Sequence, residues 1–381
     1  MMEVWESPAR YYPEGVLPAA DLAYWIAFSR VVGIGPVRFK LLYTYFKEDM
    51  AVAWHSEAKA LAQAGLDRKT IGSFLQQRHT IDPPTELKRL EHLRVRITTW
   101  KDPTYPQLLK QIPHPPHILY TCGALSEEDN FALAIVGTRK ITSYGQQVTE
   151  HFARELAANQ VTIVSGLAQG IDTVAHQTAL ATGGRTIAVL ASGLDSIYPR
   201  ANIPLARQIV DSKRGALISE FPLGVKPEGG NFPARNRIIS GLSLGVLVTE
   251  APASSGALIT AQFAQEQGRD VFAVPGSIFA KSSGGTNRLI QDGAHPTLEI
   301  DDIIKALNLF LIPQKRELQA VLPENDEERS LLALLSHEPQ HINELIQISQ
   351  LPTTTVTSTL MMMELKGMIK QLENMQFVLA R

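Results

Sequence analysis

Five glycine-rich segments in this sequence combine small residues with side chains that bind phosphate groups. They occupy residues 137–139, 165–176, 191–202, 231–243 and 250–261. Most of them follow short apolar runs that are typical of strands buried on both faces of a sheet. Parallel strands end at one edge of a sheet, where ligands bind, and glycine lets a backbone approach a ligand closely. The five segments therefore predict one shared binding edge.

Four arginines along this edge predict an anionic ligand. Arg139 occupies the turn after the apolar run at 133–136, and a helix should begin near Thr142, so that free N–H groups also face the turn. Ser255 and Gly256 precede another helix and can form an anion-binding nest. We expect the following residues to contact the ligand: Gly137, Thr138, Arg139, Ser165, Gly166, Arg200, Phe232, Arg235, Arg237, Ser255 and Gly256.

The ligand that best fits these residues is a single-stranded nucleic acid. No GxGxxG motif opens a predicted helix and no Walker motif with GK[ST] is present, which argues against a dinucleotide and a triphosphate. Arginines spread over several loops suit a run of phosphates, and Tyr198 and Phe232 lie among them as surfaces for base stacking. Because such contacts read no base edges, we expect weak sequence preference.

Some of these side chains also have structural interpretations. Arg237 can cap a helix or pair with a carboxylate, Asp172 can cap a helix, and His176 can bond to a neighbouring loop. No obvious nucleophile completes a triad with Asp172 and His176, so we predict no catalytic site. His114 and His117 lack further ligands of the usual kinds, so we predict no metal site and no cofactor.

Alternating strand and helix patterns should position the binding edge. The strand patterns are AIVG, VTIVSG, TIAVLA, ALISE, GVLVTEA and VFAVPG, and the helical patterns between them cover Tyr144–Ala158, Ile171–Ala181, Pro204–Lys213, Asn236–Gly241 and Ile259–Gln267. This alternation predicts an α/β domain with a Rossmann-like, mostly parallel sheet and helices on both faces.

Smaller regions should flank this domain. We expect an irregular arm at 1–20, a helical domain at 21–82, the extended Rossmann-like domain at 83–310, a charged linker at 311–328 and a winged-helix domain at 329–381. Between 102 and 123, five prolines predict extended segments packed beside the sheet.

The two flanking domains carry weaker functional signals. The turn Gly33-Ile34-Gly35 is typical of a helix-hairpin-helix (SAM-like) domain that binds DNA phosphates, although an ordinary helical hairpin explains it equally well. The third helix of the winged helix, at 353–367, carries only Lys366 as a cation, which favours an accessory role over DNA reading. We expect Met361, Met362 and Met363 in its core.

The composition of the chain limits the cellular location of the protein and the extent of any nucleic-acid site. The chain has 381 residues, a net charge of −2, 44% hydrophobic residues and one cysteine, Cys122. It shows no leader pattern and no apolar run that could span a bilayer, so we predict a cytoplasmic protein without an internal disulfide and without a membrane partner. A nucleic-acid site must be a local basic cluster rather than a basic surface.

Several of the motifs together resemble a known family. GTRKITSYG, SGLAQGIDTVAH, YPRAN, FPARNRIISGLS, SGALITA and SGGTNRLIQDGA are similar to segments of the DprA/Smf DNA-processing proteins of bacteria. The resemblance covers the whole sheet domain and also fits the order of the flanking domains. Two departures are small: Thr138 stands where the family usually has serine, and Ala191-Ser192 stands where glycine is common.

The resemblance carries functional implications of its own. It implies a homodimer that is not an enzyme, that binds single-stranded DNA and that delivers incoming strands to the RecA recombinase during natural transformation. It assigns phosphate contacts to Arg139, to Arg200 in YPRAN and to Arg235 in FPARNR. The dimer contacts and the surface that meets RecA are not assigned by these motifs.

Two alternative functions are also compatible with the sequence. One is a nucleotide-processing enzyme of the phosphoribohydrolase type on a related fold. The segment VPGSIF argues against this function, because at that place those enzymes resemble PGGxGT followed by glutamate. The other makes the winged helix the DNA reader and the sheet domain a platform for dimerisation. Release of base from nucleoside monophosphates would identify the first, and deletion of residues 320–381 would test the second.

Overall fold

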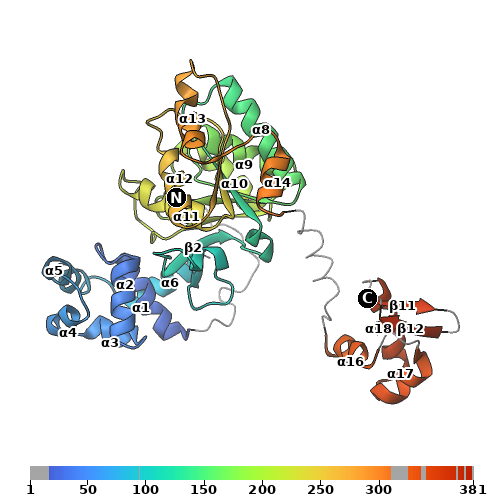
Figure 1. The fold of residues 1–381 in the computed structure, drawn as a ribbon. Helices are drawn as coiled ribbons and strands as arrows, with labels where there is room; N and C mark the ends of the chain where they lie inside the picture. The colour runs from blue at the N-terminus through green and yellow to red at the C-terminus, as the bar shows by residue number, and fades with distance from the viewer. Residues whose placement is uncertain are drawn as a thin grey trace. The chain divides into compact units, whose positions relative to one another are not determined.

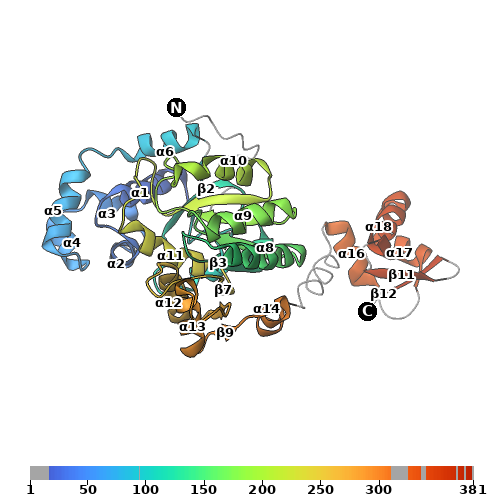
Figure 2. The same cartoon turned by 90° about the horizontal axis from the view of Figure 1, so that it is seen from above.

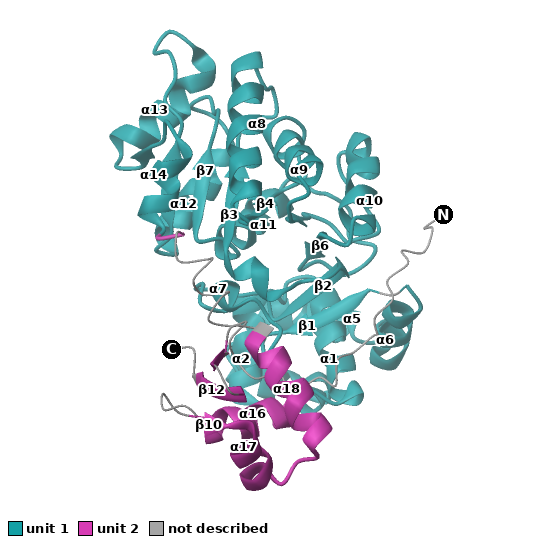
Figure 3. Cartoon of the chain, turned by 90° about the vertical axis from the view of Figure 1, so that its right-hand side faces the viewer, with its two compact units in different colours: residues 1–307 teal, residues 308–381 magenta. Residues whose placement is uncertain are grey.

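The computed structural model describes residues 17–93, 95–309, 325–335, 340–365, 368–372 and 375–379. The chain divides into two compact units, residues 1–307 and 308–381 (Figure 3). Most of the expected arm, and the part of the expected linker at 311–324, lie outside the described residues. Within the described ranges, no helix combines the length and the apolar composition needed to cross a membrane.

The first unit is built on one mixed sheet (Figure 1). Within residues 17–309 its order is β1-β2-β6-β5-β4-β3-β7-β8-β9, and the strands from β6 to β9 pair in parallel, whereas β1 and β2 are antiparallel. The bounds are β1 Arg96–Thr99, β2 Ile118–Gly123, β3 Ala132–Val136, β4 Thr162–Ser165, β5 Thr186–Val189, β6 Gly215–Ser219, β7 Gly245–Val248, β8 Asp270–Ala273 and β9 His295–Pro296. The predicted Rossmann-like, mostly parallel sheet is confirmed.

Helices cover both faces of this sheet (Figure 2). One face carries α8 Ser143–Ala158, α9 Ile171–Ala181 and α10 Ile203–Asp211, and the other carries α11 Asn231–Gly241 and α12 Ala257–Glu266. Helix α7 Gln107–Lys110 shares the hydrophobic cluster of α11 and α12. Strand β3 shows why two layers form, because Ala132, Ala134 and Val136 pack with α11 and α12 while the alternate residues Leu133 and Ile135 must face the opposite layer. The shorter helices α13 Gly284–Gln291 and α14 Ile300–Ala306 end the unit.

Two elements of the sheet domain differ from the sequence-based expectation. Helix α11 begins at Asn231 rather than Asn236, so the residues expected just ahead of a helix lie inside its first turns. Pro233 is compatible with this start because the N–H groups of a first helical turn have no acceptor within the helix. In the proline-rich segment, β2 joins the sheet between β1 and β6 instead of packing beside it.

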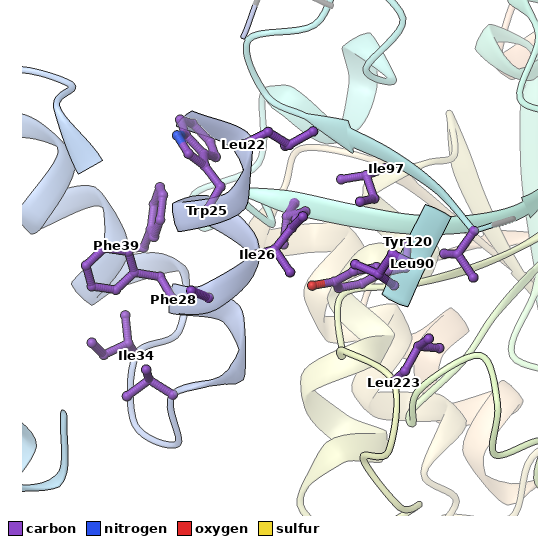
Figure 4. Packing of buried hydrophobic residues seen from close by; sticks show 14 of the residues in the cluster. Leu22, Trp25, Ile26, Phe28, Ile34, Phe39, Leu90, Ile97, Tyr120 and Leu223 are labelled. Carbon is purple, nitrogen blue, oxygen red and sulfur yellow. The ribbon is translucent and has the colours of Figure 1, made fainter. Parts of the chain in front are cut away.

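The N-terminal helices share a hydrophobic core with the antiparallel edge of the sheet. Figure 4 shows Ile26 and Phe28 of the first helix in the same cluster as Tyr120 of β2 and Leu223. The hydroxyl groups of Ser29 and Tyr120 lie 2.6 Å apart. The helices are α1 Ala19–Arg30, α2 Pro36–Tyr45, α3 Met50–His55, α4 Ala58–Gln63, α5 Arg68–Gln77 and α6 Pro83–His92.

The second unit has the arrangement of a winged helix. Its helices are α16 Asp326–Leu334, α17 Ile342–Ser349 and α18 Thr353–Leu365, and its sheet has the order β10-β12-β11, with β10 Gln340–His341, β11 Ile369–Leu372 and β12 Gln376–Leu379. Of the three consecutive methionines expected in the core, only Met363 is buried, whereas Met361 is 66% exposed and Met362 is also exposed. Successive residues of a helix point in different directions, so three in a row cannot all face one core.

Candidate nucleic-acid interface

A pocket of about 390 Å³ opens at the carboxyl ends of the central strands. The chain leaves β3 toward α8 on one face of the sheet and leaves β7 toward α12 on the other, so the pocket lies at a topological switch point. Its lining includes seven of the residues that the sequence predicts, together with four further polar or charged ones. The predicted residues are Gly137, Thr138, Arg139, Phe232, Arg235, Ser255 and Gly256, and the further ones are Lys140, Asp172, Asn236 and Thr260.

Arg139 is the exposed cation at the mouth of this pocket. Its guanidinium carbon lies 5.2 Å from the ring centroid of Phe232, in a cation–π contact. This contact with the ring leaves the N–H groups of the guanidinium available to an anion. Lys140 is also exposed and also lines the pocket. Sequence reasoning missed Lys140, although its position next to Arg139 in the same turn was an available signal.

Arg235 corrects the expectation of four exposed arginines. It is only 4% exposed, and its Nη1 donates to the carbonyl oxygens of Gly166, at 2.7 Å, and of Val189. Burial lowers the pKa of Arg235 to about 10, and the nearby carboxylate of Asp172 acts in the opposite direction. Arg235 therefore forms part of the buried floor of the pocket and ties α11 to the ends of β4 and β5.

The glycine at 166 is required by the same contact. A Cβ atom on Gly166 would lie 2.6 Å from Nη2 of Arg235, which is closer than real Cβ contacts. The N–H of Gly166 donates to Oδ2 of Asp172 at 3.1 Å, while Ser165 donates its hydroxyl proton to the carbonyl of Ile135 at 2.7 Å. Ser165 and Gly166 thus support the floor of the site and do not line the pocket.

The remaining two predicted arginines also lie outside the pocket lining. Arg237 pairs with Glu220 through two contacts of 2.7 Å, and its side chain is 12% exposed, as the structural interpretation allowed. Arg200, in the short helix Arg200–Asn202, is exposed next to Tyr198. The structure therefore replaces the expected four-arginine edge with one exposed arginine at the pocket, one exposed nearby and two that hold the fold together.

Asp172 and His176 are buried and structural. Asp172 accepts hydrogen bonds from two backbone N–H groups of its own loop, and burial raises its pKa. Nδ1 of His176 lies 2.7 Å from the hydroxyl of Thr186, and burial lowers the pKa of His176 to about 3. The hydroxyl groups beside them belong to Thr186 and Ser165, and both are buried and donate to backbone carbonyls, those of Ile163 and Ile135, so neither is placed as the nucleophile of a triad.

Glu250 holds the loop that carries Arg139. Its carboxylate accepts hydrogen bonds from the backbone N–H of Thr142, at 3.0 Å, and from the hydroxyl of Thr142, at 2.6 Å. Its backbone oxygen accepts from the N–H of Thr138 at 2.8 Å. Both ends of the Arg139 loop, residues 138–142, are therefore tied to the end of the adjacent strand β7. The sequence placed Glu250 at a strand end but gave no sign of this partner, which lies 108 residues away.

Replacing Glu250 with glutamine should loosen this anchor. The charged acceptor of two hydrogen bonds from Thr142 becomes a neutral amide with one oxygen, so both bonds weaken or reverse and we expect a loss of ~1–3 kcal/mol in the free energy of unfolding. Chemical denaturation of Glu250→Gln measures this loss. Glu266→Gln, which makes the same change on the exposed end of α12, should stay within ~0.5 kcal/mol of the unaltered protein. Equal stability of the two variants would contradict the anchoring role.

Comparison with known protein families identifies both units. The profile of the family described as DNA recombination-mediator protein A matches residues 96–308, and that of the DprA winged helix domain matches residues 315–375. The two matches cover the mixed sheet and the winged helix described above.

Individual proteins are similar over comparable lengths. The protein named Smf from Synechocystis is 36% identical over 395 residues, which cover 94% of this chain and 98% of that protein. DNA processing protein DprA of Bacillus subtilis is 47% identical over 53% of this chain and 68% of its own length. The X-ray structure of DNA processing protein A from Streptococcus pneumoniae superimposes with a TM-score of 0.65 at 35% identity, over 76% of this chain and 98% of that one.

Proposed function

Because the chain belongs to the DprA/Smf family of DNA recombination-mediator proteins, we propose that it binds single-stranded DNA at the pocket beside Arg139. The observation that carries this proposal is the exposed guanidinium of Arg139, held against Phe232 at the mouth of the pocket with Lys140 beside it. The two cations, Arg139 and Lys140, and the start of a helix after Ser255-Gly256 can bind the phosphates of a DNA strand. The contacts involve no base edge, so binding is independent of sequence.

The family's description as a recombination mediator supports a proposal about the wider role. We propose that the protein acts in the cytoplasm as a homodimer and loads a RecA recombinase onto incoming single strands during natural transformation. Light scattering of the purified protein tests the dimer, and a monomeric mass at working concentrations would exclude it. Recombinase assembly on a strand, with and without this protein, tests the loading step. The DprA/Smf family consists of DNA-processing proteins and not of enzymes, so the phosphoribohydrolase alternative is not pursued.

Replacing Arg139 with alanine should weaken binding and make it less sensitive to salt. Each phosphate contact on a single strand contributes about −0.7 to the slope of log Kobs against log salt concentration, so Arg139→Ala should reduce that slope by about 0.7. The measurement is fluorescence anisotropy of a labelled dT oligonucleotide and of a duplex, between about 50 and 200 mM salt.

A matched variant separates the local effect from a change in net charge. Arg154 is exposed on α8, three turns away from the Arg139 loop, and Arg154→Ala removes the same charge. This variant should bind the strand as the unaltered protein does. The proposal fails if the intact protein does not bind the strand, or if the two variants weaken binding equally.

A further inference from the structure

An exposed aromatic side chain, Tyr198, lies next to the pocket and contacts Phe232 of its lining. The ring of Tyr198 meets the ring of Phe232 edge-on, with centroids 5.8 Å apart and an interplanar angle of 64°. Tyr198 is 48% exposed and lies outside the pocket lining. Arg139, Phe232 and Tyr198 thus form a continuous row that runs from the pocket mouth to the loop after β5.

The two aromatic residues in this row differ in what remains free for a ligand. The guanidinium of Arg139 occupies a position over the ring of Phe232, at 5.2 Å, and Phe232 itself is half-buried. A base that stacked there would have to displace the cation that binds its phosphate. Tyr198 has no cation over its ring among the described residues, and its exposed surface faces solvent.

A second exposed cation lies two residues after Tyr198 in the same loop. Arg200 is exposed and begins the short helix Arg200–Asn202. The loop that holds Tyr198 is itself fixed, because the carboxylate of Asp195 accepts a hydrogen bond from the N–H of Gly224 at 2.9 Å. An exposed aromatic ring and an exposed arginine on one anchored loop are a combination that can hold a stacked base and its phosphate.

From this arrangement we infer that Tyr198, and not Phe232, is the stacking platform for a nucleobase, next to a phosphate on Arg200. Phe232 is a positioning residue that holds Arg139. The inference rests on the proposed function and adds a second nucleotide subsite, outside the pocket, that takes any base because every base has a stacking face.

Two other exposed aromatic residues of the sheet domain do not share this setting. Tyr144 is also 48% exposed, but its hydroxyl donates to the carbonyl of Pro275 at 2.8 Å, and it lines a different pocket with His151 and Leu298. Phe279 is 91% exposed on the loop after β8 and contacts no aromatic ring of the site. Tyr144 therefore provides a control of equal exposure.

The test uses the full chain and an oligonucleotide that contains one 2-aminopurine, whose fluorescence falls when the base stacks. Tyr198→Leu keeps an apolar contact with Phe232 but removes the ring, and Tyr198→Phe keeps the ring. Tyr198→Leu should lose the stacking of one base, which weakens binding about 5- to 150-fold. The fluorescence quenching that the unaltered protein causes when the 2-aminopurine lies at the stacked position should then disappear. Tyr198→Phe and Tyr144→Leu should bind and quench as the unaltered protein does.

The salt dependence distinguishes stacking from loss of charge. Tyr198→Leu should keep the slope of the unaltered protein, because no phosphate contact is removed, whereas Arg200→Ala should reduce it by about 0.7. If the intact protein binds and Arg139→Ala weakens binding while Tyr198→Leu changes neither affinity nor quenching, the platform is refuted and the proposed function stands. If the intact protein does not bind the strand, both are refuted.

Discussion

Replacing Arg235 with methionine should lower the free energy of unfolding by ~3–5 kcal/mol, because breaking a buried charged cluster leaves its partners unpaired. The carbonyls of Gly166 and Val189 lose their donor, and the carboxylate of Asp172 loses the nearby positive charge. Arg139→Met removes the same charge from an exposed side chain and should cost no more than ~1 kcal/mol, the value of its cation–π contact.

Intrinsic tryptophan fluorescence measures the difference in stability between these two variants in the compact unit that contains both arginines. Trp25, Trp54 and Trp100 belong to the first compact unit, and residues 308–381 contain no tryptophan, so the signal during urea unfolding does not report on the second unit. DNA binding provides a second comparison, since Arg235→Met should keep the salt slope that Arg139→Met reduces by about 0.7. An Arg235 variant that is as stable as the unaltered protein, with a reduced salt slope, would make Arg235 a phosphate ligand after all.

Acidification from pH 7 to pH 5 should cost ~2 kcal/mol of stability for each of two buried histidines. Burial lowers the pKa values of both His117 and His176 to about 3, from an ordinary value of 6.5. Between these two values the unfolded chain binds a proton that the folded chain does not. The stability that each neutral imidazole contributes is therefore complete above pH 6.5 and is lost progressively as the pH falls toward 3.

A single substitution isolates one of the two histidines. His117 stacks on Phe39 with ring centroids 3.8 Å apart, so His117→Phe keeps an aromatic ring in that place and removes the titration. The loss between pH 7 and pH 5 should shrink by ~2 kcal/mol in this variant. His114 is exposed three residues earlier, and His114→Phe should leave the loss unchanged. An unchanged loss in His117→Phe would show that folding does not lower the pKa of His117.

The strands and the edge of the sheet where the pocket lies could be predicted because their signals are local. Apolar runs such as 133–136, followed at once by glycine, identify a buried strand and its end within a few residues. The parallel pairing then brings the turns at Gly137 and Ser255 to one pocket. The start of α11 was misplaced because proline at its third position gives an ambiguous local signal.

The roles of individual arginines could not be read from local signals. Arg235 and Arg237 lie two residues apart in one helix, yet one is buried in the floor of the pocket and the other pairs with Glu220. Residues two apart in a helix point about 200° from each other, so only the neighbours on each side decide what they bind. Those neighbours, Gly166 and Glu220, precede them by 69 and 17 residues.

The sequence by itself determined the α/β class, the order of the domains and the edge at which Arg139 lies, because periodicity and strand ends are properties of short segments. Only the tertiary structure decided that Arg139 stays free on Phe232 and that Glu250 holds its loop from 108 residues away. A charged side chain is available to a ligand only if no partner within the fold satisfies it, and those partners come together only when distant strands pair.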